Sequence, residues 1–219
     1  MVRRHPKSVF GGGAYVFPGG AVDEADRRGD LGAVCVGRTE QEASALLGVE
    51  RGGLAFWVAG IRECFEEAGF LLAYGPDGDV LRLGDTQVAA RFDSHRADVD
   101  SGRRRLVEIC VEEDLRLAVD GLFYFSHWIT PEGAPRRFDT RFFVGAAPAE
   151  QTPLHDARET IAHEWIRPDR ALERHRAGGF ELMTPTMRSL EAIADFERSA
   201  DLLSAAAAGP LRDAQPCLG

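Results

Sequence analysis

Three glutamates with helical spacing are the residues of this chain best suited to chemistry. Residues 62–70 read Arg-Glu-Cys-Phe-Glu-Glu-Ala-Gly-Phe, so Glu63, Glu66 and Glu67 share one face of a helix. Two such charges about 4 Å apart repel by roughly 4 kcal/mol at an effective dielectric near 20. Arg62, at i, i+4 to Glu66, can neutralise only part of this charge. The face is therefore either solvated, as charge runs usually are, or occupied by a hard divalent cation such as Mg²⁺.

A glycine-rich turn upstream extends the pattern. Phe17-Pro18-Gly19-Gly20 precedes Asp26. Together with the helix, these residues resemble the Nudix box, G-x5-E-x7-R-E-U-x-E-E-x-G-U, in which U is a bulky apolar residue. Gly20 matches the first glycine, and Asp26 stands where the family has glutamate. Residues 27–61, 35 in all, then separate Asp26 from Arg62. Because loop closure entropy grows only logarithmically with length, so long an insertion is compatible with the motif.

The interrupted box and a later segment point to one branch of this superfamily. With Arg136-Arg137-Phe138-Asp139-Thr140, the chain resembles the branch of Nudix hydrolases that includes the peroxisomal coenzyme A diphosphatase. The resemblance implies an α/β (α+β) Nudix fold, a mixed β-sheet sandwiched between helices with helical insertions. It also implies an enzyme, a hydrolase of diphosphate bonds that uses Mg²⁺ or Mn²⁺. The favoured substrate is coenzyme A or an acyl-CoA, cleaved to 3′,5′-ADP and (acyl-)phosphopantetheine.

The same resemblance carries roles to individual residues of the box. Glu66 and Glu67 match acids that bind the metal, joined by a backbone carbonyl at Gly20. Glu63 matches an acid that binds metal or deprotonates the attacking water, and Arg62 matches the arginine that orients these acids by pairing with one of them.

Candidates outside the box carry less information. Glu159 opens a Glu-x4-Glu-Trp segment seen in some relatives, and we expect it either to complete the catalytic site or to be an ordinary loop acid. Arg4 and Arg137 are candidates for binding substrate phosphates, because the guanidinium fork suits phosphate, although surface arginines usually have no such role. The six histidines form no ligand spacing, so we expect structural or solvent-facing roles for them.

Composition narrows the class of protein. A chain of 219 residues with 44% apolar content can form one domain, and we expect a single Nudix domain over residues 1–219. A net charge of −9 argues against a general nucleic-acid binder. No apolar run has the length of a membrane span and no signal peptide is visible. The four cysteines lack disulfide or metal spacing, which indicates reduced thiols in the cytoplasm.

Local patterns predict the elements that must position the box. A helix is expected over 54–68, and a shorter one opens at the capping box Thr39–Glu42 and closes at Gly48. The other expected elements are strands at 1–6, 14–17, 70–74, 122–129, 137–146 and 162–166, helical additions at 27–53 and 85–115, and helices at 169–177 and 183–208. The family ordinarily has a strand before the Arg3-Arg4 pair, so we expect that strand to be missing from the chain start. An exposed sheet edge there would favour a homodimer.

Three functions stay open at this stage. The first is a coenzyme A diphosphatase, and the second is a Nudix hydrolase of another nucleoside diphosphate derivative such as ADP-ribose, NADH or a dinucleotide polyphosphate. In both, the partner is a small molecule. The third is a non-catalytic ligand-binding module, which the three intact helix acids disfavour and which the Asp26 replacement and the missing N-terminal strand keep open.

Overall fold

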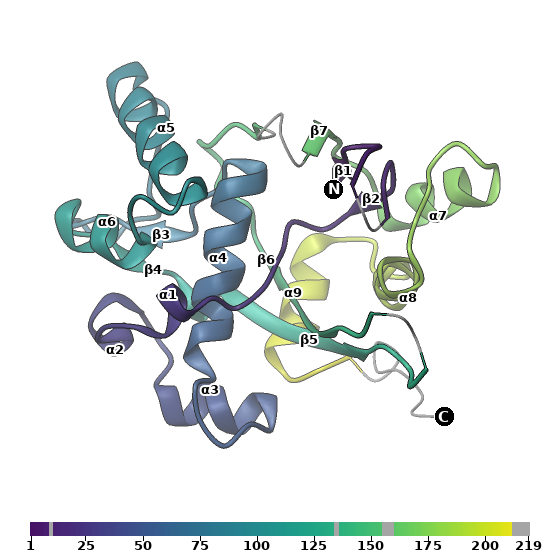
Figure 1. The fold of residues 1–219 in the computed structure, drawn as a ribbon, viewed down its shortest axis with the longest axis horizontal. Helices are drawn as coiled ribbons and strands as arrows, with labels where there is room; N and C mark the ends of the chain where they lie inside the picture. Colours follow the sequence, from purple (N-terminus) through teal and green to yellow (C-terminus); the bar gives the residue numbers. More distant parts are fainter. Residues whose placement is uncertain (9–10, 134–135, 155–159, 212–219) are drawn as a thin grey trace. The chain divides into compact units, whose positions relative to one another are not determined.

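The computed structural model describes residues 1–8, 11–133, 136–154 and 160–211, and it divides into two compact units (Figure 1). The first unit contains Met1–Phe17, Leu122–Ala146 and Glu164–Gly219, and the second contains Pro18–Gly121 and Ala147–His163. Both mix helices with strands, as the sequence predicts. A single domain over the whole chain stays a prediction. Within the described parts of the chain, no helix combines the length and apolar character needed to cross a membrane.

A long hairpin organises the first unit. β5 (Leu122–Ile129) pairs antiparallel with β6 (Asp139–Gly145), close to the predicted bounds, with a register shift between Tyr124 and Ser126. The short strands β1 (Val2–Arg4) and β2 (Tyr15–Val16) are also antiparallel. The helices of this unit are α7 (Pro168–Arg176), α8 (Thr184–Ile193) and α9 (Ser199–Ala207). Their apolar faces share one core cluster with residues of the hairpin.

The single helix predicted over 183–208 is wrong, because two helices, α8 and α9, occupy this stretch. The turn between them follows Ile193, and both Phe196 and Leu202 pack against the same core cluster as Ile193. In one continuous helix, at about 100° per residue, Leu202 would point roughly 180° away from Ile193. The break therefore returns Leu202 to the core.

The second unit is built around α4 (Leu54–Ala68), whose bounds are those predicted (Figure 1). The 27–53 segment supplies α2 (Leu31–Val34) and α3 (Glu40–Leu47), and α1 (Glu24–Arg27) precedes them. The 85–115 segment supplies α5 (Thr86–Asp100) and α6 (Leu106–Glu112). Helices α1, α3 and α5 all contact α4. The remaining elements are the antiparallel pair β3 (Ala73–Tyr74) and β4 (Arg116–Leu117), the 3-10 turn η1 (Val119–Gly121), and β7 (Thr160–His163), which begins and ends earlier than the predicted 162–166.

One face of α4 is fully buried. Ile61 and Phe65 lie on this face, as predicted, and are at most 1% exposed. Phe56 and Cys64, predicted beside them, are only half-buried. Trp57 is the largest buried side chain, and the guanidinium of Arg38 lies 4.9 Å from the centre of its ring. Because Arg38 belongs to the inserted segment, the insertion covers part of the helix that follows it in sequence.

The insertion also holds the start of α4. The carboxylate of Glu40 on α3 accepts hydrogen bonds from the N–H groups of Gly52 (2.5 Å), Gly53 (3.0 Å) and Leu54 (3.0 Å), and from Ser44 Oγ (2.7 Å). A Cβ atom on Gly53 would lie 2.3 Å from the backbone nitrogen of Ser44. Glutamate thus caps the otherwise unpaired N–H groups of a helix N-terminus, where negative charge is stabilising.

We expect Glu40→Gln to lower the free energy of unfolding by about 1 kcal/mol at pH 7, the usual magnitude for loss of a helix cap. Burial opposes ionisation of Glu40, but the hydrogen bonds from Ser44, Leu54 and the two glycines outweigh it and lower its pKa. A lowered pKa stabilises the fold above the pKa of the unfolded chain, and this contribution disappears as the pH falls through the folded pKa. The difference in the free energy of unfolding between variant and wild type should therefore become smaller below about pH 4. Urea unfolding across this pH range measures it. Glu50→Gln, an exposed neighbour on the same segment, is the control, and equal losses in both variants would contradict the capping role.

Candidate functional site

The acids predicted from the sequence gather around the guanidinium of Arg62, which is 7% exposed. Its Nε and Nη2 donate to Asp26 Oδ1 (2.9 Å) and Oδ2 (3.0 Å). Nη1 donates to Glu63 Oε1 and to Glu66 Oε2, both at 2.9 Å, and Nη2 also donates to the carbonyl of Ala21 at 2.9 Å. An arginine has five donor hydrogens, so these contacts use its full capacity. One guanidinium therefore orients three carboxylates, where the sequence predicted pairing with one.

Asp26 joins the two halves of the interrupted motif. It is 3% exposed, and it lies 36 positions before Arg62 in the sequence. Its two oxygens meet the guanidinium edge in the fork geometry that gives strong, directional pairs. Oδ2 also accepts from the backbone N–H of Asp23 at 2.8 Å, which fixes the first turn of α1. The shorter carboxylate thus makes a full contact despite the long insertion.

The glycine loop lies directly against the helix acids. The backbone N–H of Gly19 donates to Glu67 Oε2 at 3.1 Å, and Glu67 is 8% exposed. A Cβ atom on Gly20 would lie 2.3 Å from Glu63 Oε1, so a side chain there would displace the carboxylate. The structure therefore brings the predicted opening glycine together with the predicted acids.

The electrostatics of this cluster favour a cation. Burial raises the pKa of Glu66 to about 7 and also raises the pKa of Glu63, and Arg62 only partly offsets it in each case. Burial disfavours the charged guanidinium of Arg62, yet its hydrogen bond to Asp26 and the glutamate charges raise its pKa overall. Arg62 forms ion pairs with Asp23, Asp26, Glu63 and Glu66, and Glu67 contacts the adjoining glycine loop. Oxygen-only donors with excess negative charge are the set that a hard divalent ion prefers.

A cavity of about 180 Å³ adjoins the cluster. Asp26, Arg62 and Glu66 form part of its lining, and the loop between α5 and α6 contributes Arg104 and Arg105. The cavity therefore combines the acidic face with basic side chains from the 85–115 segment.

Three predicted site residues are not placed in this cluster. Glu159 lies outside the described residues. Arg4 is on β1, and Arg137 precedes β6, where its Nε donates to the carbonyl of Thr130 at 3.2 Å. Both arginines belong to the first unit, whereas the cluster belongs to the second. Their roles in substrate binding stay predictions.

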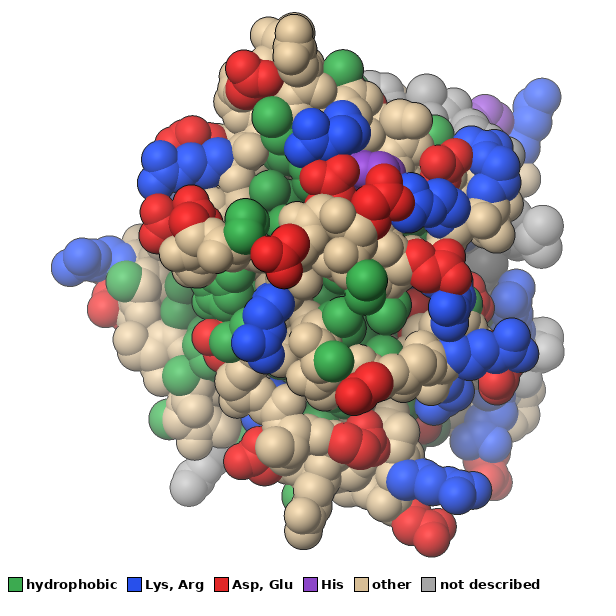
Figure 2. All heavy atoms as spheres, turned by 90° about the vertical axis from the view of Figure 1, so that its left-hand side faces the viewer, with side chains coloured by type: hydrophobic (Ala, Val, Ile, Leu, Met, Phe, Trp, Pro, Cys, Tyr) green, Lys and Arg blue, Asp and Glu red, His purple; other side chains and the backbone are tan. Residues whose placement is uncertain are grey.

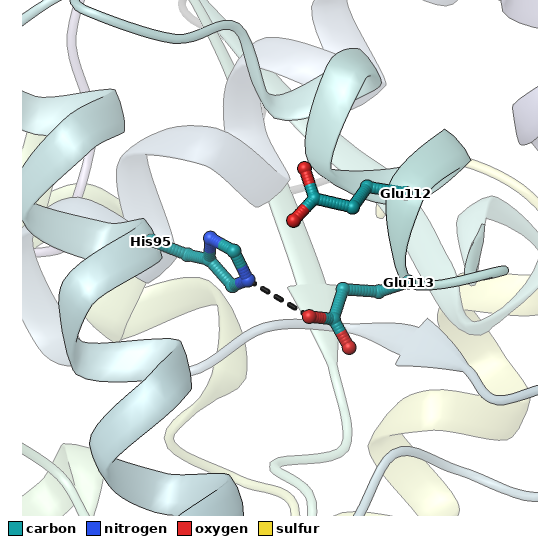
Figure 3. A group of neighbouring side chains, drawn as sticks. All are labelled: His95, Glu112 and Glu113. Atoms are coloured by element: carbon teal, nitrogen blue, oxygen red, sulfur yellow. Dashed lines mark hydrogen bonds and ion pairs between the residues drawn. The ribbon is translucent and has the colours of Figure 1, made fainter.

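A second polar group on the α5–α6 side was missed from the sequence. His95, Glu112 and Glu113 offer ligand atoms within 4.8 Å of one another (Figure 3). His95 Nε2 lies 2.9 Å from Glu113 Oε1, Arg91 donates to both oxygens of Glu113, and Arg104 pairs with Glu112. Because two arginines already balance the two carboxylates, we interpret this group as an ion-pair network joining α5 to α6. Figure 2 shows acidic and basic side chains interspersed on the left-hand face of Figure 1, which carries these helices.

Comparison with known proteins identifies the family. A family model described as the NUDT19 Nudix domain matches residues 38–193. The chain belongs to this family of Nudix hydrolases. Curated members similar to it are the acyl-coenzyme A diphosphatases NUDT19 of Homo sapiens, 28% identical, and Gallus gallus, 30% identical. Each comparison covers 92% of this chain and 62% of the relative, so the chain spans 62% of the length of these relatives.

The fold of the NUDT19-family chain is also that of a solved Nudix structure. The crystal structure of a Nudix hydrolase from Alicyclobacillus acidocaldarius is similar with a TM-score of 0.71 and 23% sequence identity. The similarity covers 93% of this chain and 86% of the other. The predicted Nudix fold is therefore confirmed. The family match begins at residue 38, after the glycine loop, and the contacts of Gly19 with Glu67 and of Ala21 with Arg62 link that loop to the matched region.

We expect Asp26→Asn to lower the free energy of unfolding by about 2 kcal/mol, because the amide keeps only one acceptor oxygen, so a buried donor of Arg62 or of the Asp23 backbone loses its partner. Chemical denaturation at pH 7 measures this loss. Asp23→Asn is the matched control: its side chain is 61% exposed and lies 3.7 Å from Arg62, so the loss should stay below about 1 kcal/mol. Similar losses in the two variants would show that Asp26 does not join the halves of the motif.

Proposed function

We propose that this chain is a divalent-metal-dependent hydrolase that cleaves the diphosphate linkage of coenzyme A or an acyl-CoA. The observation that carries the proposal is that four Arg62 donors hold Asp26, Glu63 and Glu66, while the fifth binds the carbonyl of Ala21 beside the glycine loop. A solvated acidic face would not need a buried arginine saturated in this way. The acids are oriented, and they carry more negative charge than Arg62 can balance.

The residues fit a magnesium or manganese ion. The side chains of Glu63, Glu66 and Glu67 and the carbonyl of Gly20 would hold it. All are oxygen donors, which these ions prefer, and a glycine is the residue that lets the loop backbone approach Glu63. When bound, the ion would supply positive charge for the diphosphate oxygens and would favour deprotonation of an attacking water.

The chain's own groups orient this reaction. Arg62 contacts one oxygen each of Glu63 and Glu66, and the Gly19 N–H contacts one oxygen of Glu67. We propose that Glu63 either binds the ion or accepts a proton from the attacking water. The water oxygen then forms a bond to one phosphorus while the bridging P–O bond breaks, and the leaving phosphate carries away the bridging oxygen. From coenzyme A, the products are 3′,5′-ADP and 4′-phosphopantetheine.

The choice of substrate rests on the relatives. Curated members of the family are named acyl-coenzyme A diphosphatases, and they match 92% of this chain. The basic side chains of Arg104 and Arg105 at the cavity beside the acids suit an additional phosphate. Arg4 and Arg137 stay candidates for phosphate binding, and Glu159 stays the candidate for a further catalytic acid.

We expect Glu67→Gln to reduce hydrolysis by at least about 100-fold with little effect on the fold, because even residues that only support metal ligands commonly contribute 10- to 100-fold. The assay follows products by liquid chromatography with mass detection in Mg²⁺ or Mn²⁺. Its panel contains coenzyme A, acetyl-CoA, ADP-ribose, NADH and diadenosine polyphosphates. Glu24→Gln, on the exposed side of α1, is the control and should retain wild-type rates.

Each outcome decides between the open functions. Release of 3′,5′-ADP and 4′-phosphopantetheine, lost with EDTA and in Glu67→Gln, would establish the coenzyme A activity. If the wild type hydrolyses another compound of the panel but neither coenzyme A nor acetyl-CoA, the substrate is a different nucleoside diphosphate derivative. If the wild type hydrolyses no compound of the panel, the result would instead support a ligand-binding module.

A further inference from the structure

A buried arginine of the 85–115 segment reaches the end of α4. Arg96 on α5 is 8% exposed. Its Nε and Nη2 donate to the carbonyl of Glu66 at 2.9 Å and 2.6 Å, and Nη2 also donates to the carbonyl of Leu154 at 2.7 Å. The last carbonyls of a helix have no partner within the helix, so an external donor is required where the end is buried. Arg96 supplies it at Glu66, whose own side chain belongs to the acid cluster.

The segment around Leu154 is fastened to the same helix end. The N–H of Leu154 donates to the carbonyl of Ala68 at 3.0 Å. Gly69 ends the helix in the left-handed conformation, with φ of 77°, and a Cβ atom there would lie 3.2 Å from the Leu154 nitrogen. Glycine is therefore needed at this position for both its backbone angle and the close approach of Leu154.

The charge of Arg96 suits its position. A helix C-terminus carries partial negative charge, so a cation there is stabilising. Arg96 projects from a helix that is itself held in place, because His95 on α5 contacts Glu113 at the end of α6 (Figure 3) and Arg91 pairs with the same glutamate. A braced helix can thus fix the last turn of α4.

We infer that Arg96 is a positioning residue for the metal-binding face: by holding the carbonyls of Glu66 and Leu154 together, it fixes the turn from which Glu66 and Glu67 project. This inference rests on the proposed function, in which those two glutamates hold the metal. It assigns the 85–115 segment a role in orienting the site.

The inference is tested by metal binding rather than by activity alone. We expect Arg96→Met, which keeps length but removes every donor, to weaken Mn²⁺ binding by about 10-fold or more, since groups that support metal ligands commonly contribute 10- to 100-fold. The hydrolysis rate constant kcat should fall by a similar factor with KM little changed. Arg96→Lys can reach one of the two carbonyls and should give an intermediate loss. Electron paramagnetic resonance of Mn²⁺ titrated into metal-free protein measures the affinity.

Arg103→Met is the matched control. Arg103 follows the same helix, its side chain is 62% exposed and it pairs with Asp98, so its removal should leave Mn²⁺ affinity and kcat at wild-type values. All titrations are done below the unfolding temperature of each variant, verified by circular dichroism. Wild-type Mn²⁺ affinity and kcat in folded Arg96→Met would overturn the inference. If Arg96→Met does not fold, the same measurements on Arg96→Lys test the inference, and wild-type Mn²⁺ affinity and kcat would overturn it.

Amide hydrogen exchange of the metal-free protein separates this inference from the proposed function. Faster exchange at Gly69, Phe70 and Leu154 in Arg96→Met than in Arg103→Met would support the positioning role, and equal exchange would contradict it. If the wild type binds Mn²⁺ but cleaves no panel substrate, the substrate proposal fails. The Mn²⁺ titration still tests whether Arg96 positions the metal-binding face. If the wild type binds no Mn²⁺, the metal proposal fails. Amide hydrogen exchange then tests by itself whether Arg96 fixes the last turn of α4.

Discussion

The placement of one guanidinium among four carboxylates is the constraint on which the rest of the second unit depends. Charge-assisted hydrogen bonds are strong and directional, so Arg62 fixes not only net charge but the position of every group that it contacts. Its acceptors come from α1, from the loop at Ala21 and from α4 itself. The arginine therefore sets where the loop and the helices meet. Because it cannot balance all the acids, the same contacts that organise the site also leave it with excess negative charge.

The two added segments hold opposite ends of the helix that carries these acids. Glu40, from the insertion, accepts from the first N–H groups of α4, and Arg96, from the second addition, donates to a carbonyl of its last turn. An anion at the N-terminus and a cation at the C-terminus both oppose the partial charges of the helix ends. The additions thus do more than lengthen the chain: they satisfy backbone groups that a buried helix would otherwise leave unpaired.

Local signals in the sequence were sufficient for the elements and insufficient for the contacts between them. The bounds of α4 and α3 follow from apolar spacing, a capping box and the glycines at 48 and 69, all of which act within a few residues. The contacts of Arg96 with Glu66 and of His95 with Glu113 join residues 30 and 18 positions apart. Such pairs leave no periodic trace, because they depend on how helices pack. The separation of α8 from α9 was missed for the same reason, since the core contact of Leu202 decides it.

The contacts of Asp26 change how the replacement of glutamate by aspartate at position 26 is interpreted. On sequence alone, the shorter acid kept open a degenerate, non-catalytic module that the three intact helix acids disfavoured. In the structure, Asp26 is buried, binds Arg62 through both oxygens and also accepts the N–H of Asp23. The bond from Arg62 to the carbonyl of Ala21 holds the chain before α1 close to α4, so a side chain one methylene shorter still reaches the guanidinium. The departure from the family pattern is therefore compensated locally, and it no longer weighs against an assembled hydrolase site.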